Sequence, residues 1–399
     1  MINCDFLVIG GGVIGVNVAR KLRRRYPDAK IILIEKEADC GLHASGRNSG
    51  VLHAGFYYTP DSLKARYTRM GNMAMTGYCR EKGIEINACG KLVVARDEAD
   101  LPQLDELLRR GRANGVPLEE LTDSEARAIE PRVRTCGRAL FSPTTASVDP
   151  VEVMRHMTGD ARREGVEIHV GVGFLAAGQG SVSTTAGNYS AGYIVNAAGL
   201  YADRIARDFG FSEHYSILPF KGLYLYSDEP KGSIRTNIYP VPDLRNPFLG
   251  VHYTLTAKGD VKIGPTAIPV FWREQYRGLE NFRLTEFAEI VYRQLGLFAH
   301  SNFDFKKLAV EELRKHSRAR MAQLAGVLVE GVDPGRYRRW AKPGIRAQLL
   351  DHRTRKLEMD FVIEGDARSL HVLNAVSPAF TCSLPFAEHV CSEIDRLIH

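Results

Sequence analysis

The chain has 399 residues, of which 44% are hydrophobic and 25% are charged, with a formal net charge of +6 at pH 7. This composition excludes a disordered or fibrous chain, and the length allows two domains with sizeable cores. So mild a charge gives no argument for a nucleic-acid partner. The seven cysteines contain no CxxC pair, which indicates neither a metal site nor a disulfide framework and favours a reducing compartment.

The chain starts directly with a predicted strand, with no basic leader and no cleavable apolar segment. No apolar run reaches the roughly 18 residues that a membrane-spanning helix needs. We therefore expect a cytoplasmic protein, and peripheral contact with an inner membrane stays open.

The first motif is a glycine turn between a predicted strand and a predicted helix. The apolar run 5–9 leads into Gly10-x-Gly12-x-x-Gly15, and a helix is predicted over 16–25. In this geometry Gly10 allows a tight turn, Gly12 lets the backbone approach a pyrophosphate at the helix N-terminus, and Gly15 lets the helix pack on the strand. The alternative is a glycine turn that packs a βαβ unit and holds no ligand.

An acidic residue at the end of the second predicted strand supports the ligand-binding interpretation. The strand 30–34 ends in Glu35, which follows Gly15 by 20 residues. At this spacing a carboxylate meets the ribose hydroxyls of a dinucleotide. Strand, turn, helix and acid together predict a dinucleotide cofactor.

A long loop over 40–59 follows, rich in glycine, serine and asparagine. A nicotinamide-binding unit would return to a helix at this point. This loop instead has the small residues and backbone donors that suit a second, flat cofactor ring beside it. A helix is predicted over 61–82, where Leu63, Tyr67 and Met70 share one face.

The middle of the chain alternates strand and helix patterns. Strands are predicted at 91–95, 166–175, 181–185 and 193–199, and helices at 101–114, from 123 onward, at 151–164 and at 201–209. The strand 193–199 ends in small residues and precedes a helix, which indicates that the chain returns to the cofactor-binding sheet here.

From 216 to 269 the pattern becomes β-rich, with glycine, proline and aspartate between the runs. Strands are predicted at 218–226, 234–241, 248–256 and 261–264, helices at 284–298 and 305–325, a short strand at 370–373, and a closing helix at 385–398. We therefore expect two interleaved domains: a discontinuous cofactor-binding domain at 1–90, 145–215 and 340–399, and a substrate-binding domain at 91–144 and 216–339.

Several stretches carry a resemblance to a known family. The glycine fingerprint with Glu35, the strand end 196–199 and the C-terminal strand, loop and helix resemble the FAD-dependent oxidoreductases of the D-amino-acid oxidase superfamily. Five further stretches narrow the resemblance: 45–55, 240–243, 247–252, 344–348 and 374–379. On these stretches the chain is similar to the L-2-hydroxyglutarate oxidase/dehydrogenase family, over nearly its whole length.

The resemblance implies an α/β fold, with a Rossmann-like FAD-binding domain of the GR2, or D-amino-acid-oxidase, type and an interleaved α+β substrate domain built on an antiparallel sheet. The chain departs from the family at Lys221, where an arginine is usual, and at 375–381, which is bulkier than usual.

FAD is the cofactor that the resemblance implies. We expect the glycine turn at its pyrophosphate, Glu35 at its ribose, and backbone amides before the last helix at the ring edge where reduction places negative charge. The predicted cofactor-binding residues are Gly10, Gly12, Val13, Ile14, Gly15, Glu35, Lys36, Ser45, Gly46, Arg47, Asn48, Ser49, Gly50, Val172, Ala198, Gly199, Ser377, Pro378 and Thr381. Val172 is included because its strand would pass the adenine; an ordinary strand valine is the alternative.

Two histidines are candidates for the base that takes a substrate hydroxyl proton, since neutral imidazole suits that role near pH 7. They are His53 in the flavin loop and His252 on a predicted strand of the substrate sheet. His53 could also carry a covalent link to the flavin, as in some relatives, and a hydrogen-bonded core histidine is the alternative for either. Arg346 is the third predicted catalytic residue, because a guanidinium could hold the α-carboxylate or the negative charge of the reduced flavin; a structural ion pair is the alternative.

Three further residues are weaker candidates for substrate binding. Lys221 offers a point charge for a carboxylate. Tyr58 and Tyr239 could donate hydrogen bonds, and core packing is the alternative for both. A basic run at 336–342, which includes two aromatic residues, could rest on an anionic membrane or be a solvated loop.

Together these residues predict one reaction, in which a hydride leaves the substrate Cα for flavin N5 while a base takes the hydroxyl proton and cations hold the carboxylate. We expect oxidation of a 2-hydroxy acid to the 2-oxo acid, with L-2-hydroxyglutarate as substrate and oxygen or a membrane quinone as electron acceptor. An amine oxidase of the glycine or sarcosine type is the alternative enzyme. A flavoprotein scaffold for RNA or protein is a third class, against which the mild charge and the lack of an RNA-binding motif argue.

Overall fold

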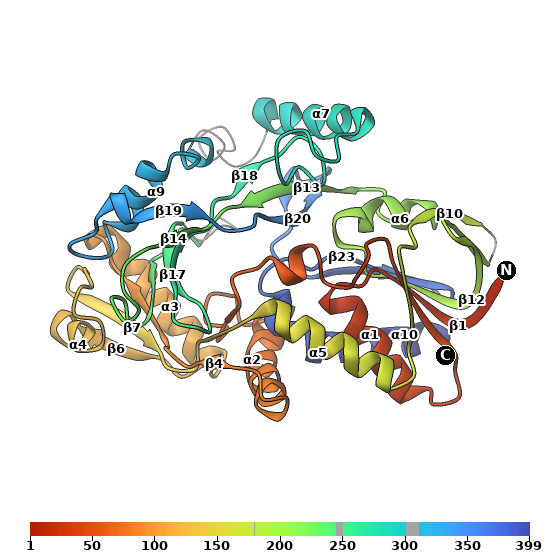
Figure 1. The fold of residues 1–399 in the computed structure, drawn as a ribbon, viewed down its shortest axis with the longest axis horizontal. Helices are drawn as coiled ribbons and strands as arrows, with labels where there is room; N and C mark the ends of the chain where they lie inside the picture. Colours follow the sequence, from red (N-terminus) through yellow and green to blue (C-terminus); the bar gives the residue numbers. More distant parts are fainter. Residues whose placement is uncertain (179, 245–249, 301–310) are drawn as a thin grey trace.

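The structure, a computed structural model, describes the whole chain except residues 179, 245–249 and 301–310. In Figure 1 the two chain ends lie together at one end of an elongated molecule, and α4, β6 and β7 lie at the other. The predicted elements 248–256 and 305–325, and the family-like stretch 247–252, fall partly outside the described residues.

A mostly parallel sheet forms the end of the molecule that holds both termini. Its strands run in the order β10 (Phe174–Gly178), β11 (Ser181–Thr184), β12 (Gly187–Asn196), β1 (Ile2–Ile9), β2 (Ile31–Glu35) and β9 (Glu167–Val170), and β23 (Ser369–Asn374) pairs with β12 and with β22 (Val362–Gly365). β1 is parallel to both β12 and β2. Segments from the start, middle and end of the chain therefore meet in one sheet, as the sequence predicted.

Helices cover this sheet on both faces. On one face lie α1 (Val13–Arg25), α5 (Pro150–Arg163), α10 (Ala379–Ile398) and, outside α10, α2 (Leu63–Glu81). The other face packs on α6 (Ala202–Asp208). Leu7, Val8 and Leu33 have no exposed surface, because a parallel sheet with both faces covered is buried throughout.

The closing helix α10 begins six residues before the predicted start, and Pro385 lies inside it. Proline has no N–H, so the carbonyl of Thr381, four residues earlier, loses its helical partner. Gly71 of α2 packs against this carbonyl, and a Cβ on Gly71 would overlap it. A glycine on a neighbouring helix thus makes room for the proline-interrupted turn, which a local sequence pattern does not show.

The second large sheet carries the substrate side of the molecule. Its order is β19 (Tyr337–Trp340), β14 (Leu225–Ser227), β17 (Val261–Gly264), β16 (His252–Leu255), β15 (Asn237–Pro240), β5 (Lys91–Val94), β7 (Arg138–Ser142) and β6 (Glu119–Thr122). Among its described pairs all are antiparallel except β15 with β5. β5, from an early segment of the chain, lies between β15 and β7.

A smaller antiparallel sheet, in the order β18 (Ile268–Pro269), β13 (Tyr215–Gly222), β20 (Gly344–Asp351) and β21 (Lys356–Leu357), lies between the two large sheets. The sequence did not predict β20, which pairs with β13 over eight positions. We propose the domain division 1–90, 145–215 and 340–399 against 91–144 and 216–339; the β13–β20 pair would then join the domains.

Three further strands, β3 (Val51–Leu52), β4 (Ile86–Asn87) and β8 (Ala146–Val148), form a small sheet. The other α-helices of the described residues are α3 (Leu101–Ala113), α4 (Asp123–Ile129), α7 (Leu284–His300) and α9 (Arg318–Ala325). Two predicted strands are each broken in the structure: 166–175 into β9 and β10, and 218–226 into β13 and β14. Within the described residues, no helix combines the length and apolar character needed to cross a membrane.

Candidate active site

A cavity of about 1030 Å³ opens where the carboxyl ends of β1, β2 and β12 meet the loop after β2, the start of α10 and strand β20. Ligands of open α/β sheets bind at this edge. Most of the predicted site residues line it: Gly10, Gly12, Val13, Ile14, Glu35, Lys36, Ser45, Arg47, Asn48, Ser49, His53, Val172, Ala198, Gly199, Arg346, Ser377, Pro378 and Thr381.

The glycine turn has no room for side chains. A Cβ on Gly10, whose φ is +110°, would lie 2.6 Å from the carbonyl oxygen of Ala197, and a Cβ on Gly15 would overlap the carbonyl oxygen of Gly10. Gly12 differs, because its Cβ would meet only the Ser45 hydroxyl, at 3.2 Å. Gly10 and Gly15 are therefore required by the fold itself, whereas Gly12 keeps a space clear at the start of α1.

The start of α1 is prepared for an anion. Gly12 is its N-cap residue and supplies no side-chain cap, so the first amides of the helix have no helical partner. The Val13 amide donates to the Ser45 hydroxyl at 2.9 Å, which fixes the loop after β2 beside the turn. A phosphate at this helix start would meet backbone donors and the positive end of the helix dipole.

Glu35 is held at the cavity wall by two backbone amides. Its Oε2 accepts from the Gly11 amide at 2.7 Å, and its Oε1 accepts from the Glu37 amide at 2.9 Å. Each carboxylate oxygen retains acceptor capacity for a ribose hydroxyl.

The flavin loop is braced by its own polar side chains. Asn48 donates to the Ser45 carbonyl at 2.7 Å, and its Oδ1 accepts from the Gly50 amide at 2.8 Å. Arg47 donates to the Leu42 carbonyl at 2.7 Å. Gly46 and Gly50, like Gly15, do not line the cavity in the described structure; they are packed against backbone carbonyls that a Cβ would strike.

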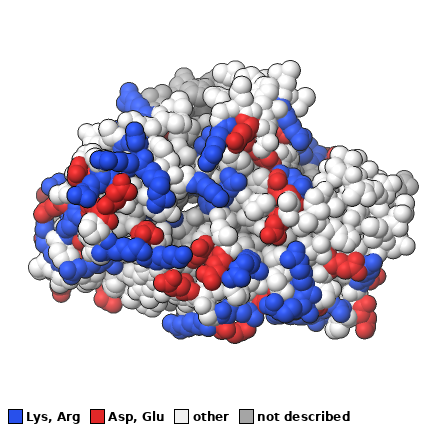
Figure 2. All heavy atoms as spheres, viewed as in Figure 1, with Lys and Arg blue, Asp and Glu red and all other residues white. Residues whose placement is uncertain are grey.

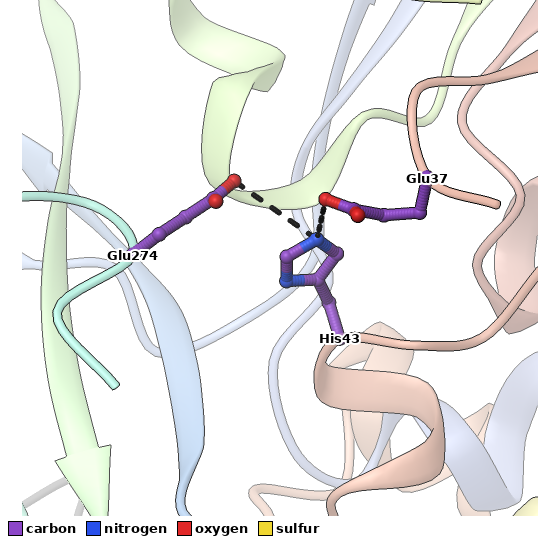
Figure 3. A group of neighbouring side chains, drawn as sticks. All are labelled: Glu37, His43 and Glu274. Atoms are coloured by element: carbon purple, nitrogen blue, oxygen red, sulfur yellow. Dashed lines mark hydrogen bonds and ion pairs between the residues drawn. The ribbon is translucent and has the colours of Figure 1, made fainter. Parts of the chain in front are cut away.

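Two acids and a histidine gather at the cavity rim, although the sequence predicted none of the three. Figure 3 shows Glu37 and Glu274 approaching His43, whose Nε2 lies 2.9 Å from Glu37 Oε1. Such a set could hold a metal ion, but the ammonium of Lys36 bonds to Glu37 and lies 2.7 Å from Glu274 Oε1. Burial opposes the charge of Lys36, yet these two carboxylates raise its pKa. Lys36 therefore supplies the positive charge, and we assign no metal here.

The start of α10 forms the opposite wall of the cavity. Its N-cap residue, Pro378, gives no side-chain cap, and residues 375–381 line the cavity. The Thr381 hydroxyl donates to the Val51 carbonyl at 3.3 Å and accepts from the His53 amide at 3.2 Å. This bond pair fixes the backbone of His53 beside the helix start, where backbone amides favour negative charge.

The two candidate bases have different surroundings. His53 lines the cavity, is buried, and its Nδ1 finds no hydrogen-bond partner among the described residues. Burial, together with the positive charge of Lys91, lowers the pKa of His53 to about 3. His252 does not line the cavity; its ring stacks on Tyr239 at 3.6 Å between centroids, and its Nδ1 lies 3.0 Å from the Gly250 carbonyl.

Arg346 reaches the cavity from β20. It pairs with Phe220 across the sheet and donates from Nη1 to the Thr266 carbonyl at 3.0 Å. Its guanidinium lies against Gly222, where the lack of a side chain leaves room for the guanidinium. Burial lowers the pKa of the guanidinium; it stays cationic at neutral pH because an arginine in a protein is not deprotonated there.

The three weaker candidates lie away from the cavity wall. Lys221 is next to Phe220, the strand partner of Arg346, and so points to the other sheet face, since neighbouring residues of a strand alternate. Tyr58 is half-buried, with the Lys64 ammonium 6.0 Å from its ring centroid. Tyr239 is buried under His252. The structure therefore brings together His53 and Arg346 but not these three residues.

Sequence reasoning missed three groups beside the cavity. Tyr224 lines it, and Lys262 donates to the Ser49 carbonyl at 3.0 Å with its ammonium 4.7 Å from the Tyr224 ring. Lys91 is fully buried behind His53. A lysine at an otherwise apolar strand position is the sequence signal that could have identified Lys91 and Lys262.

The parallel sheet, the glycine turn and the cavity at the carboxyl ends of the strands define a dinucleotide-binding protein. A family model described as "FAD dependent oxidoreductase" (DAO) matches residues 5–393. The chain belongs to this family of FAD-dependent oxidoreductases, and FAD is its cofactor.

Among curated proteins, it is 35% identical to the L-2-hydroxyglutarate dehydrogenase of Escherichia coli K12, over 99% of this chain and 94% of that one. It is also 35% identical to the mitochondrial L-2-hydroxyglutarate dehydrogenase of Homo sapiens, over 98% of this chain and 89% of that one. The family resemblance that the sequence predicted is confirmed.

Two solved structures share the fold. The L-α-glycerophosphate oxidase of Mycoplasma pneumoniae with FAD bound has a TM-score of 0.77 at 22% identity, covering 100% of this chain and 95% of that one. The glycine oxidase of Geobacillus kaustophilus has a TM-score of 0.72 at 19% identity, covering 99% and 95%. These neighbours confirm the predicted fold class.

The residues present fit FAD. The space that Gly12 keeps clear and the uncapped start of α1 suit a pyrophosphate, the held carboxylate of Glu35 suits a ribose, and the uncapped start of α10 suits the pyrimidine edge of a flavin.

Proposed function

We propose that this protein oxidises L-2-hydroxyglutarate to 2-oxoglutarate with its FAD. The observation that carries the proposal is the meeting of His53 and Arg346 in one cavity, from segments almost 300 residues apart, in a chain whose full-length relatives are named for this substrate. A base and a fixed cation are the two groups that oxidation of a 2-hydroxy acid requires from the protein.

In the proposed reaction, Arg346 holds the α-carboxylate, which turns the substrate Cα toward the cofactor. His53, which lines the cavity, accepts the hydroxyl proton on its neutral imidazole. The bound flavin supplies the hydride acceptor. The amides at the start of α10 stabilise the negative charge that reduction produces, and the buried wall around His53 excludes water.

The neutral imidazole of free His53 is ready to accept a proton but binds one weakly, because burial and the Lys91 charge lower its pKa to about 3. A substrate carboxylate near these groups would offset the positive charge and strengthen the base. We assign the base to His53 rather than His252, since only His53 of the two lines the described cavity.

The amine-oxidase alternative has weaker support. Glycine oxidases share the fold, but at 16% to 19% identity this likeness extends to the fold alone. The curated relatives at 35% identity are hydroxy-acid dehydrogenases.

An anaerobic substrate panel tests the proposal. L-2-hydroxyglutarate should bleach the flavin absorbance, whereas D-2-hydroxyglutarate, glycine and sarcosine should leave it unchanged. Bleaching by glycine or sarcosine alone would support the amine-oxidase alternative. A flavin that no 2-hydroxy acid reduces would refute the proposed function.

We further propose that a membrane quinone, rather than oxygen, receives the electrons. Five apolar side chains are exposed in this region: Leu279 and Phe282, which precede α7, and Leu284, Tyr292 and Leu295, which lie on one stripe of the helix. Of these, Phe282 lines the cavity. In Figure 2 the outermost surface at the top, where α7 lies in Figure 1, is mostly uncharged, with basic and acidic side chains below and beside it. The basic run 336–342 has a weaker claim to membrane contact, because its Tyr337 is buried in the substrate-side core.

This acceptor proposal predicts that the wild-type enzyme sediments with anionic liposomes and that Leu279→Ser with Tyr292→Ser abolishes the association. The reduced flavin should be reoxidised faster by a short-chain quinone than by air-saturated buffer. Faster reoxidation by oxygen, with no liposome binding, would contradict it.

A further inference from the structure

Lys91 is a buried lysine with no counter-ion among the described residues. It begins β5, in the middle of the substrate sheet, between Asn237 of β15 and Ser142 of β7. Its side chain has no exposed surface, and its Nζ finds no hydrogen-bond partner among the described residues. Burial alone lowers its pKa, to about 7, and no described carboxylate opposes this shift.

Three aromatic rings surround the ammonium. Its Nζ lies 4.6 Å from the ring centroid of Phe56, 4.5 Å from that of Tyr57 and 4.8 Å from that of Tyr239. Ring faces attract a cation, but they give it no directed hydrogen bond and no neutralising charge. A buried ammonium in such a cage therefore lacks a hydrogen-bond acceptor and a neutralising negative charge.

The cage lies beside the proposed base. Phe56 and Tyr57, whose rings contact the ammonium, follow His53 by three and four residues in the flavin loop. In keeping with this proximity, the Lys91 charge lowers the pKa of His53. The hydroxyl of Tyr57 is also buried without a described hydrogen-bond partner. An ammonium and a hydroxyl, both strong donors, are therefore available together behind His53.

The other cations of this region already have partners. Lys262 donates to the Ser49 carbonyl, Arg346 donates to the Thr266 carbonyl, and Asp360 supports the charge of Lys64. Among the described lysines, Lys91 alone combines full burial of the ammonium with the absence of a hydrogen bond. An anion bound beside Lys91 would therefore relieve more uncompensated positive charge than one bound beside the other cations named here.

We propose that Lys91, with the Tyr57 hydroxyl, binds the second carboxylate of a dicarboxylic 2-hydroxy acid, while Arg346 holds the first. This inference rests on the proposed function and names the residue that selects a dicarboxylate over a monocarboxylate. The carboxylate supplies the counter-ion that the described part of the chain does not provide. It also offsets the charge that weakens His53 as a base, so the correct substrate strengthens the group that deprotonates it.

The test compares ligands of equal chain length. Lys91→Met replaces the ammonium with an apolar group of similar length, Tyr57→Phe removes only the hydroxyl, and the exposed Lys258→Met is the control. The oxidisable pair is L-2-hydroxyglutarate and L-2-hydroxypentanoate; the inert pair is glutarate and pentanoate, whose binding is followed by the change in flavin absorbance.

In Lys91→Met we expect kcat/KM for L-2-hydroxyglutarate to fall about 100-fold, and in Tyr57→Phe about tenfold. L-2-hydroxypentanoate should lose no activity in either variant, because loss of the Lys91 charge also raises the pKa of His53. Glutarate should lose its binding advantage over pentanoate in Lys91→Met. The thermal midpoint of this variant should rise, because it removes an unpaired buried charge.

Equal losses for both chain types, or unchanged selectivity in Lys91→Met, would overturn the assignment of Lys91. A wild-type enzyme that binds glutarate no better than pentanoate would overturn it as well. If the wild type oxidises no 2-hydroxy acid, the proposed function fails separately, and the glutarate comparison still decides the role of Lys91.

Discussion

Replacement of Arg346 by methionine removes the cation that we assign to the substrate α-carboxylate. The side chain is half-buried on the cavity wall, and one of its donors is already committed to the Thr266 carbonyl. Loss of one partner of a buried charge pair costs 2–5 kcal/mol. Because the site is open to the cavity, we expect the lower part of this range, about 2–3.4 kcal/mol, which corresponds to a 30- to 300-fold fall in kcat/KM.

The assay is anaerobic flavin reduction by L-2-hydroxyglutarate, in which the loss of flavin absorbance is recorded after rapid mixing. Arg346→Lys, which keeps the charge but loses the two-pronged geometry, should fall between wild type and Arg346→Met. Arg353→Met is the matched control, since Arg353 lies on the exposed turn after the same strand and pairs with Asp351. It should stay within about twofold of wild type.

FAD content and thermal midpoint must be measured on each variant, because a misfolded cavity would also lower the rate. An Arg346→Met enzyme that retains its FAD and reduces it within threefold of the wild-type rate would refute the assignment of Arg346 to the substrate carboxylate.

Further predictions concern the cofactor and the pH dependence of stability. Gly12→Ala should weaken FAD binding in a flavin titration and leave the thermal midpoint of the apoprotein nearly unchanged. Gly15→Ala should lower that midpoint, because its Cβ overlaps a backbone carbonyl. Equal effects of the two variants on the apoprotein midpoint would contradict this distinction. Burial lowers the pKa of His371 to about 4, below the unfolded value of 6.5, so its stabilising contribution is complete above pH 6.5 and is lost as the pH falls toward 4. The free energy of unfolding should therefore fall by about 2 kcal/mol between pH 7.5 and pH 5 because of His371. Urea melts of His371→Gln at several pH values should lack this decrease, and a pH dependence unchanged from the wild type would refute the prediction. Acid precipitation should release the flavin if His53 serves as the base, and yellow colour retained on the pellet would show a covalent link instead.

The sequence predicted the cofactor side of the molecule well, because its signals are local. A glycine turn between a strand and a helix, with Glu35 at a fixed spacing, requires one geometry, and the structure has it. The elements that the sequence missed depend on distant partners. β20 is recognised by its pairing with β13, and the early start of α10 depends on Gly71 of another helix.

The same reason limits what the sequence could say of the site. His53 and Arg346 were predicted from family-like stretches, and they do line one cavity. Glu274 and Lys91 lie in segments with no motif, and only folding brings one beside Lys36 and the other behind His53. Lys221 was proposed as a carboxylate ligand, but its strand register turns it away from Arg346, which chain composition could not reveal; its role as a ligand remains a prediction.

The most direct test of the account is single-turnover reduction of the enzyme-bound flavin by L-2-hydroxyglutarate carrying deuterium at C2, with no oxygen present. We predict complete bleaching, one 2-oxoglutarate formed per flavin, and slower reduction with the deuterated substrate than with the ordinary one, because the Cα hydride moves in that step. Absence of bleaching would contradict the proposed substrate. Bleaching at the same rate with the deuterated and the ordinary substrate would contradict the claim that hydride transfer limits the observed rate.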